Sequence, residues 1–398
     1  KNPNVLTKVV SSDWTTLDPV QCYDAACGEV LQNTLENLIF YDGVNAGKFV
    51  PALAQEVPSK RNGGISSDGK TYTFTLKSGL RFSDGSPLTA QDVEYSLERM
   101  LVTSSGDGPA SLLIEPILGS GDLIRAQDTG AYRQIDAAIS TTGNRVVVKL
   151  AKPFSPLLSV LASSFFGIYS KAHALERGEW NGSAESWIKA NNPKNESSSY
   201  RATLPLGSGP FMLERYEAGR VLILKRNPNY WRGPAVLERV LLQVVSEETT
   251  RDQMLRVGEA DLVQLSRGVI GALEGVSGVS VVDNQPNLAL DAILFNQRIE
   301  GEGTGYLGSG KLDGKGIPAD FFSDVNVRKG FAYALNYKTL IQDIMQNKAR
   351  QNNTVLVRGV PGYSINGPRY KLDRTQAKAY FQAAFGGKVW QEGFELPI

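Results

Sequence analysis

Hydrophobic and polar residues alternate most clearly between residues 71 and 77, where apolar side chains take every second position: Tyr72, Phe74 and Leu76. This period predicts a strand with one buried face. A turn at Asp68-Gly69 precedes the strand. After a second turn at 83–87, an apolar stripe at helical spacing is formed by Val93, Leu97, Met100 and Leu101. Because Asp92 stands three positions after Thr89, we expect a helix capped at Thr89.

Apolar runs elsewhere predict further elements. We expect strands at residues 5–10, 146–150, 206–216, 221–226 and 240–245. We expect a helix at residues 27–40 and a pair of helices across 324–349. We expect a further helix that is capped by Thr249, runs to Val257 and stops at Gly258. Between residues 109 and 144 the pattern is mixed, and we expect helical pieces that complete a small α/β subdomain. The last residues, 393–398, predict the start of another strand.

Composition excludes several classes of protein. The 398 residues exceed one compact core and favour two or three domains. Basic and acidic side chains, 42 and 41, nearly cancel without blocks of like charge, so we expect no nucleic-acid partner. No uninterrupted apolar run reaches the roughly 18 residues of a membrane span. The first residue is Lys1, which fits a mature or engineered chain whose export signal has been removed.

Cys22 and Cys27 are the only cysteines, five positions apart in a loop-like stretch. They could be unpaired small residues or a short-loop disulfide, and an oxidising compartment would favour the disulfide. A zinc pair has little support, since tetrahedral zinc needs more Cys or His ligands than the chain offers.

Support for an enzyme is weak. His173 is the only histidine, which rules out a two-histidine metal motif and leaves one candidate base for a catalytic triad. A lone histidine is more often a surface or packed residue. Paired carboxylates of the glycosidase kind stay open, because spacing in sequence does not reveal separation in space. We therefore predict no catalytic residue, no metal and no cofactor.

Two other functions have partial motifs or none. Residues 305–311 fit the phosphate-loop pattern GxxxxGK, but Leu312 stands where Ser or Thr would hold magnesium. The segment 313–316, Asp-Gly-Lys-Gly, cannot open the helix that would bind the phosphate. An extracellular adhesion protein would be supported by repeats, and the sequence has no internal period.

Several segments together resemble a known family. They are GKTYTFTL at 69–76, FSDGSPLTAQDV at 82–93, YSLER at 95–99, LDP at 17–19, LGSGPFMLERY at 206–216 and NPNYW at 227–231. The residues of these segments and the order of the segments are similar to those of the family 5 extracytoplasmic solute-binding proteins, the peptide, nickel and oligosaccharide receptors of ABC importers. Such a long ordered match is far more specific than one short motif.

The resemblance implies an α/β fold with two lobes, of the periplasmic-binding-protein type II, cluster C. Lobe I would combine residues 1–45 with 150–250 and carry 46–149 as an inserted subdomain, and lobe II would be 251–398. Family members continue further, so we expect lobe II to lack its C-terminal part. In the peptide-binding members, an acidic residue that pairs with the ligand's amino terminus lies in that further part.

The resemblance also implies a function. We expect the extracytoplasmic substrate-binding component of an ABC importer, which captures di- or oligopeptides between two closing lobes and delivers them to the permease. A nickel chelate, haem or an oligosaccharide is the alternative ligand, and a secreted hydrolase or adhesion protein is the alternative of another class. We expect a periplasmic or extracytoplasmic monomer, associated with the cell envelope through the permease or a lipid anchor.

Candidate site residues follow from the same resemblance. The family's first cleft loop corresponds to residues 23–27, which makes candidates of Tyr23, Asp24, Ala26 and Cys27. Phe166, Tyr169 and Asn296 are further candidates, and the family has such an Asn at the end of a strand that would cover 288–295. Core packing is the alternative for the two aromatic residues. Trp14 is another possible contact from its place before the LDP segment, but we expect it to lie in the core.

Overall fold

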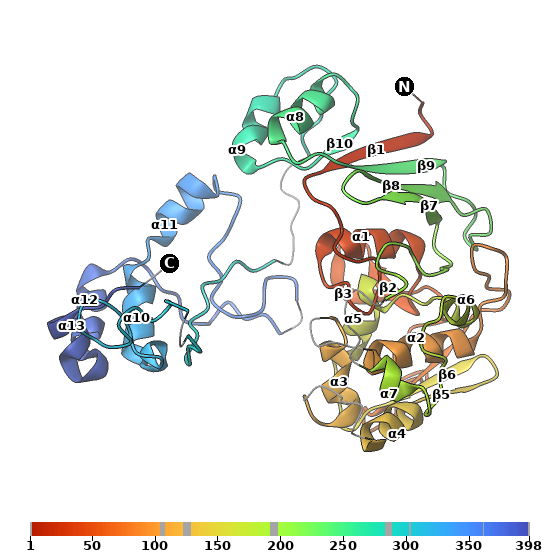
Figure 1. Ribbon diagram of the computed structural model, residues 1–398, viewed down its shortest axis with the longest axis horizontal. Helices are drawn as coiled ribbons and strands as arrows, with labels where there is room; N and C mark the ends of the chain where they lie inside the picture. The colour runs from red at the N-terminus through yellow and green to blue at the C-terminus, as the bar shows by residue number, and fades with distance from the viewer. Residues whose placement is uncertain are drawn as a thin grey trace. The chain divides into compact units, whose positions relative to one another are not determined.

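The computed structural model describes residues 2–103, 108–121, 129–191, 198–282, 289–301, 304–360 and 362–396. The chain divides into two compact units, Lys1–Val281 and Val282–Ile398, and each is described by itself (Figure 1). Unit 1 holds one large core that both of its main sheets share, and unit 2 has a small core of its own.

A five-stranded sheet organises the first part of unit 1, in the order β10-β1-β9-β8-β7. Its strands are β1 (Val5–Val10), β7 (Phe211–Glu217), β8 (Val221–Arg226), β9 (Arg239–Val244) and β10 (Leu262–Val263). β1 runs parallel to both neighbours, β9 and β10, whereas β7, β8 and β9 form an antiparallel meander. The strands predicted at 5–10, 221–226 and 240–245 are confirmed as β1, β8 and β9, whereas the strand predicted at 206–216 begins only at Phe211, as β7.

A three-stranded antiparallel sheet lies within the predicted insertion, in the order β4-β6-β5. Its strands are β4 (Thr71–Thr75), β5 (Ile139–Thr142) and β6 (Arg145–Lys149), and its helices are α2 (Ala90–Val102), α3 (Ser111–Leu118) and α4 (Thr129–Ala138). Tyr72 and Phe74 are buried, as the alternation predicts. The Asp92 carboxylate accepts hydrogen bonds from the Thr89 backbone N–H and hydroxyl, both at 2.8 Å, so the predicted cap is confirmed.

The first helix is shorter than predicted. α1 (Ala25–Thr34) ends six residues before residue 40, and Ile39 already belongs to the hairpin of β2 (Ile39–Asp42) and β3 (Asn45–Pro51). The end of the helix is fixed by the chain at 207–209: the Gly209 N–H donates to the Thr34 carbonyl at 3.0 Å. A Cβ on Gly207 would lie 2.1 Å from the same carbonyl oxygen, so glycine is required there.

Short helices complete unit 1: α5 (Leu157–Leu161), η1 (Ser164–Phe166), α6 (Lys171–Glu176), α7 (Trp187–Ala190), α8 (Glu248–Arg256), α9 (Arg267–Ile270) and η3 (Gly271–Leu273). Figure 1 shows α8 beside the β10 edge of the five-stranded sheet. The predicted Thr249 cap is wrong, because Glu247 is the N-cap residue and Thr249 lies inside α8. Gly258, with φ of +75°, follows the end of the helix as predicted.

The regular elements of unit 2 are helices, and long irregular segments join them in the described residues. Its elements are η4 (Phe321–Ser323), α10 (Val325–Ala334), α11 (Tyr337–Thr339), the π-helix η5 (Leu340–Ile344), α12 (Arg374–Ala383), η6 (Ala384–Gly387) and α13 (Lys388–Glu392). The predicted helix pair is present and breaks at Leu335, after which the Asn336 side chain accepts a hydrogen bond from the Thr339 N–H at 3.2 Å.

Two expected strands are absent from the described part of unit 2. Leu288 lies outside the described residues, and 289–295 form no strand; Leu294 is 88% exposed. Residues 393–396 are also irregular, and the Phe394 ring packs against the Phe321 ring, with 5.0 Å between the ring centroids. A strand needs a neighbour to pair with, and the described residues of unit 2 supply none. Across all the described residues, no helix combines the length and apolar character needed to cross a bilayer.

Candidate functional site

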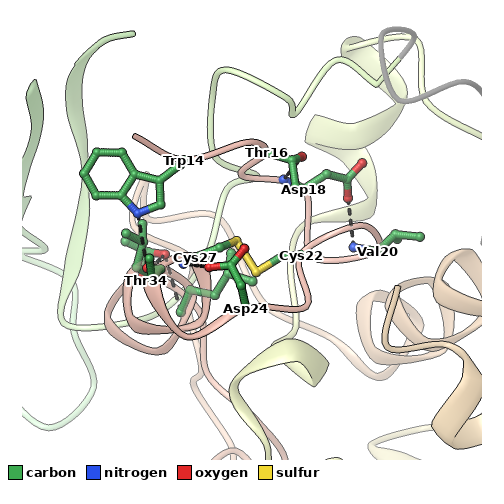
Figure 2. Close-up of a disulfide and its surroundings, with 11 residues drawn as sticks. Trp14, Thr16, Asp18, Val20, Cys22, Asp24, Cys27 and Thr34 are labelled. Atoms are coloured by element: carbon green, nitrogen blue, oxygen red, sulfur yellow. Dashed lines mark hydrogen bonds between the residues drawn. A yellow bond between two sulfur atoms is a disulfide. The ribbon is translucent and has the colours of Figure 1, made fainter. Parts of the chain in front are cut away.

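A disulfide closes the loop that precedes α1. It joins Cys22 to Cys27, both fully buried, and so encloses residues 23–26 in a short covalent loop at the start of the helix (Figure 2). The loop before it is also fixed, because the Cys22 N–H donates to the Asp18 carbonyl at 2.8 Å. The backbone around Tyr23 is therefore held on both sides.

Asp24 is the N-cap of α1. Its Oδ1 accepts a hydrogen bond from the Cys27 N–H at 2.9 Å, and its carbonyl accepts from the Gly28 N–H at 3.0 Å. A carboxylate at this position also meets the positive end of the helix dipole. Asp24 therefore stabilises the start of α1 while its side chain stays at the surface.

Trp14 ties the preceding loop to the same helix. Its indole Nε1–H donates to the Ala26 carbonyl at 3.2 Å (Figure 2), and its ring meets Tyr216 edge to face, with 6.1 Å between the ring centroids. Trp14 is buried, as expected, whereas the Ala26 side chain is exposed.

Tyr23 differs from the other aromatic residues in the described part of unit 1, because it alone is exposed, at 48%. Its ring meets that of half-buried Phe165 edge to face, 5.4 Å between centroids. Phe165 in turn lies against α1 at Gly28, where a Cβ would be 3.2 Å from its Cε1. Tyr23, Asp24, Ala26 and Phe165 together form what we call the Tyr23 surface.

The other predicted site residues lie elsewhere. Phe166 and Tyr169 are buried in the core of unit 1, so packing accounts for both side chains. Burial raises the pKa of Tyr169 to about 12, and its hydroxyl accepts a hydrogen bond from Arg99 at 3.2 Å. Asn296 belongs to unit 2, where it is exposed and its Oδ1 accepts from the Arg298 N–H at 3.1 Å.

A buried ion pair behind the loop was not predicted. Arg99 of α2 donates to both carboxylate oxygens of Asp18, at 2.9 and 2.7 Å, and to Glu179 at 2.7 Å. Burial by itself would raise the pKa of Asp18, but the Arg99 guanidinium reverses this effect and holds that pKa below its usual value. Asp18 and Arg99 stand in the LDP and YSLER segments, and the resemblance of these segments to the family was the only sequence signal for the two residues.

The same network reaches a third segment of the chain. The Ser198 hydroxyl donates to the Asp18 carboxylate at 2.5 Å, and the Ser199 N–H donates to Glu179 Oε1 at 2.9 Å. Each acceptor of the network is therefore engaged, as buried charges require. The arrangement anchors the loop that carries Tyr23 to α2.

His173 has packing partners. Its Nδ1 accepts from the Leu206 N–H at 3.4 Å, and its ring stacks on Tyr200, with 6.1 Å between centroids. Burial, and then the nearby Arg177, lower its pKa, so the ring is neutral at pH 7. Among the described residues, no group of three His, Cys, Asp or Glu side chains is placed to hold a metal ion.

Comparison with known proteins gives consistent results. The model of the bacterial extracellular solute-binding proteins, family 5, matches residues 48–397. A probable D,D-dipeptide-binding periplasmic protein of Escherichia coli is 25% identical over 370 residues, which are 93% of this chain and 60% of that protein. The chain thus spans less than two thirds of the length of that relative.

Solved structures show the fold. OppA of Listeria monocytogenes bound to peptide matches with a TM-score of 0.67 and 22% identity over 99% of this chain and 70% of that one. NikZ of Campylobacter jejuni, in complex with Ni(L-His), matches with a TM-score of 0.64 and 17% identity over 96% and 63%. The predicted two-lobed α/β binding-protein fold is confirmed, while the predicted residue bounds of the lobes stay a prediction.

Proposed function

We propose that this chain, which belongs to the bacterial extracellular solute-binding proteins of family 5, captures small peptides outside the cytoplasm for an ABC importer. The observation that carries the proposal is the similarity to a D,D-dipeptide-binding protein over 93% of the chain. The Cys22–Cys27 disulfide supports an oxidising compartment, where such bonds persist. The partners would be a peptide and the permease, and the protein would act as a monomer at the cell envelope.

The Tyr23 surface would form part of the peptide site. Tyr23 offers an exposed aromatic face, and the disulfide and the Asp24 cap hold its backbone in place before any ligand arrives. A site that is ordered in advance loses less conformational entropy on binding. Ala26 and Asp24 complete the exposed edge, while Cys27 acts through the disulfide. Asn296 stays a candidate contact from unit 2.

We propose binding without catalysis. The matched family consists of solute-binding proteins. Within the described residues, His173 is engaged by Leu206 and Tyr200, and Asp18 and Glu179 are both paired with Arg99. These titratable groups are held by packing and ion pairing, an arrangement that suits a scaffold.

Mass spectrometry of the co-purified ligand tests the proposal. The protein is purified without denaturant and then denatured, and the released small molecules are weighed. A ladder of peptide masses supports peptide capture, whereas a single mass matching a nickel chelate, haem or a sugar overturns it. If nothing is released, calorimetry with di- to pentapeptides and with a nickel–histidine chelate decides, since binding of the chelate alone would also overturn the proposal.

A further inference from the structure

A pocket of about 270 Å³ lies in unit 1, away from the Tyr23 surface. Thr34, the last residue of α1, contributes to its wall, whereas Tyr23 precedes the first residue of that helix. A helix of ten residues is about 15 Å long, so the length of α1 separates the pocket from the Tyr23 surface. The proposed peptide site therefore does not use this pocket.

The pocket has apolar and polar walls. Leu204, Leu206 and Phe211 supply apolar surface, and Leu204 and Phe211 are themselves buried. Its volume lies slightly below the roughly 300 Å³ at which sites for drug-sized ligands begin. A small molecule with an apolar body therefore fits it better than a peptide does.

Ser83 places an unpartnered hydroxyl group at the pocket. The backbone of Ser83 is fixed, because its N–H donates to the Gly207 carbonyl at 2.9 Å and its carbonyl accepts from Asn229 Nδ2 at 3.0 Å. The residue is only 6% exposed, yet its hydroxyl makes no hydrogen bond with a described residue. Unlike the Ser208 hydroxyl, it is not sealed in the core, so a molecule in the pocket can satisfy it.

His173 offers a second donor on the pocket wall. Its Nδ1 accepts from the Leu206 N–H at 3.4 Å and lies 3.4 Å from the Tyr200 hydroxyl. Because Nδ1 is an acceptor, the proton of the neutral ring is on Nε2. Nε2 has no hydrogen-bond partner within the described part of the chain, so its N–H is left to donate to a ligand.

Arg177 adds a positive charge to the same pocket. It follows α6, is exposed and forms no ion pair with any residue that the structure describes. Burial lowers the pKa of His173 and the charge of Arg177 lowers it further, whereas Glu176 and Asp84 each raise it by less. The guanidinium therefore acts on the imidazole more strongly than either nearby carboxylate does.

Two carboxylates at or near the pocket are already engaged. Glu214, on the pocket wall, accepts from the Arg239 guanidinium at 2.6 and 2.9 Å. Asp84 Oδ1 accepts from the N–H and the hydroxyl of Ser86, at 2.8 and 2.6 Å. The three groups described above remain free, and all three can donate a hydrogen bond.

We propose that this pocket is a second ligand site, which binds a small carboxylic acid with an apolar body. The carboxylate accepts hydrogen bonds from Arg177, from the Nε2–H of His173 and from the Ser83 hydroxyl, while the apolar body lies against Leu204 and Phe211. Charge-assisted bonds of this kind favour a carboxylate over a neutral group of the same shape. The site goes beyond peptide capture and does not depend on it.

The ring of His173 is a direct reporter of binding, because it is the only histidine of the chain. In protein without a histidine tag, its ring-proton resonances are followed by NMR as phenylacetate is added at constant pH and ionic strength. We expect a saturable shift with a Kd of about 1–10 mM, the range of a weak fragment, and a rise in the pKa of His173. Phenylacetamide keeps the apolar body without the charge and should bind at least about tenfold more weakly.

Variants test the donors one at a time. Arg177→Gln removes the charge at an exposed position and should weaken phenylacetate binding at least about tenfold, and Ser83→Ala should weaken it by about tenfold. The matched control is Arg201→Gln, because Arg201 is an exposed arginine of unit 1 outside the pocket wall, and phenylacetate binding should not change. Peptide binding should be unchanged in Arg177→Gln, which separates this test from that of peptide capture.

Any of three results would overturn the proposal. One is a His173 resonance that phenylacetate does not move at concentrations well above the expected Kd. Another is equal affinity for phenylacetate and phenylacetamide, and the last is wild-type affinity for phenylacetate in Arg177→Gln. The tripeptide Gly-Gly-Phe distinguishes a free acid from a peptide carboxyl terminus, since a shift caused by the tripeptide and not by phenylacetate also counts against the proposal.

Discussion

The guanidinium of Arg99 and the carboxylate of Asp18 form a two-point ion pair inside unit 1, with N–O distances of 2.9 and 2.7 Å. Both residues are 1% exposed, and they are 81 positions apart in the chain. The pair joins α2 of the insertion to the loop that leads into the disulfide. The position of Tyr23 at the surface therefore depends on a contact in the core.

Removing one partner of this pair should destabilise unit 1 strongly. We expect Arg99→Met to lower the free energy of unfolding by about 3–5 kcal/mol, because it leaves the Asp18 carboxylate buried without its counter-charge. The double variant Asp18→Asn/Arg99→Met should recover part of this loss. Urea unfolding followed by tryptophan fluorescence measures both changes. A double variant that is less stable than the single one would contradict the explanation.

The disulfide should stabilise the same region. Replacing Cys22 and Cys27 together by Ala removes a short covalent loop, for which we expect a loss of about 2 kcal/mol from increased entropy of the unfolded chain. The matched control is Asp24→Ala, which keeps the disulfide and removes the helix cap, at about 1 kcal/mol. Urea unfolding of the two variants under non-reducing conditions compares these contributions. Equal stability of the cysteine variant and the wild type would refute the predicted contribution of the disulfide.

Substitution of Gly28 tests whether the Phe165 side chain is packed tightly against α1. A Cβ at this position would lie 2.9 Å from Ser164 Oγ and 3.2 Å from Phe165 Cε1, so Gly28→Ala must displace these side chains. A Cβ added to Gly268 in α9 would have no atom within 4 Å, so this glycine serves as the control. We expect Gly268→Ala to stabilise its helix by about 0.5–1 kcal/mol and Gly28→Ala to give no such gain. Thermal unfolding of both variants checks this, and a matching gain would show that Phe165 moves freely.

Local signals in the sequence predicted local structure well. The alternation of Tyr72 and Phe74 and the Thr89–Asp92 spacing depend only on neighbouring residues, and β4 and α2 form as expected. The end of α1 at Thr34 was missed, because it is set by backbone contacts from Gly207 and Gly209, far along the chain.

The candidate site was predictable only in part, for a similar reason. Resemblance to the family pointed to residues 23–27, and the exposed Tyr23 and the Asp24 cap lie there. No sequence period separates an aromatic residue that lines a site from one in the core, so the burial of Phe166 and Tyr169 had to come from the structure. The Asp18–Arg99 pair likewise depends on two distant segments meeting.

Tyr23 gives the most direct test of the candidate site. If a peptide side chain packs on its ring, Tyr23→Ala should weaken peptide binding by about 0.5–1.5 kcal/mol, the usual contribution of an aromatic pair, which is roughly a twofold to tenfold loss of affinity. Tyr23→Phe keeps the ring and should bind nearly as well as the wild type. Tyr306→Ala removes another exposed tyrosine, from unit 2, and should leave affinity unchanged. Calorimetry with a peptide that the protein retains on purification measures all three. Wild-type affinity in Tyr23→Ala, with Tyr306→Ala also unchanged, would remove the Tyr23 surface from the peptide site while leaving peptide capture by the protein intact.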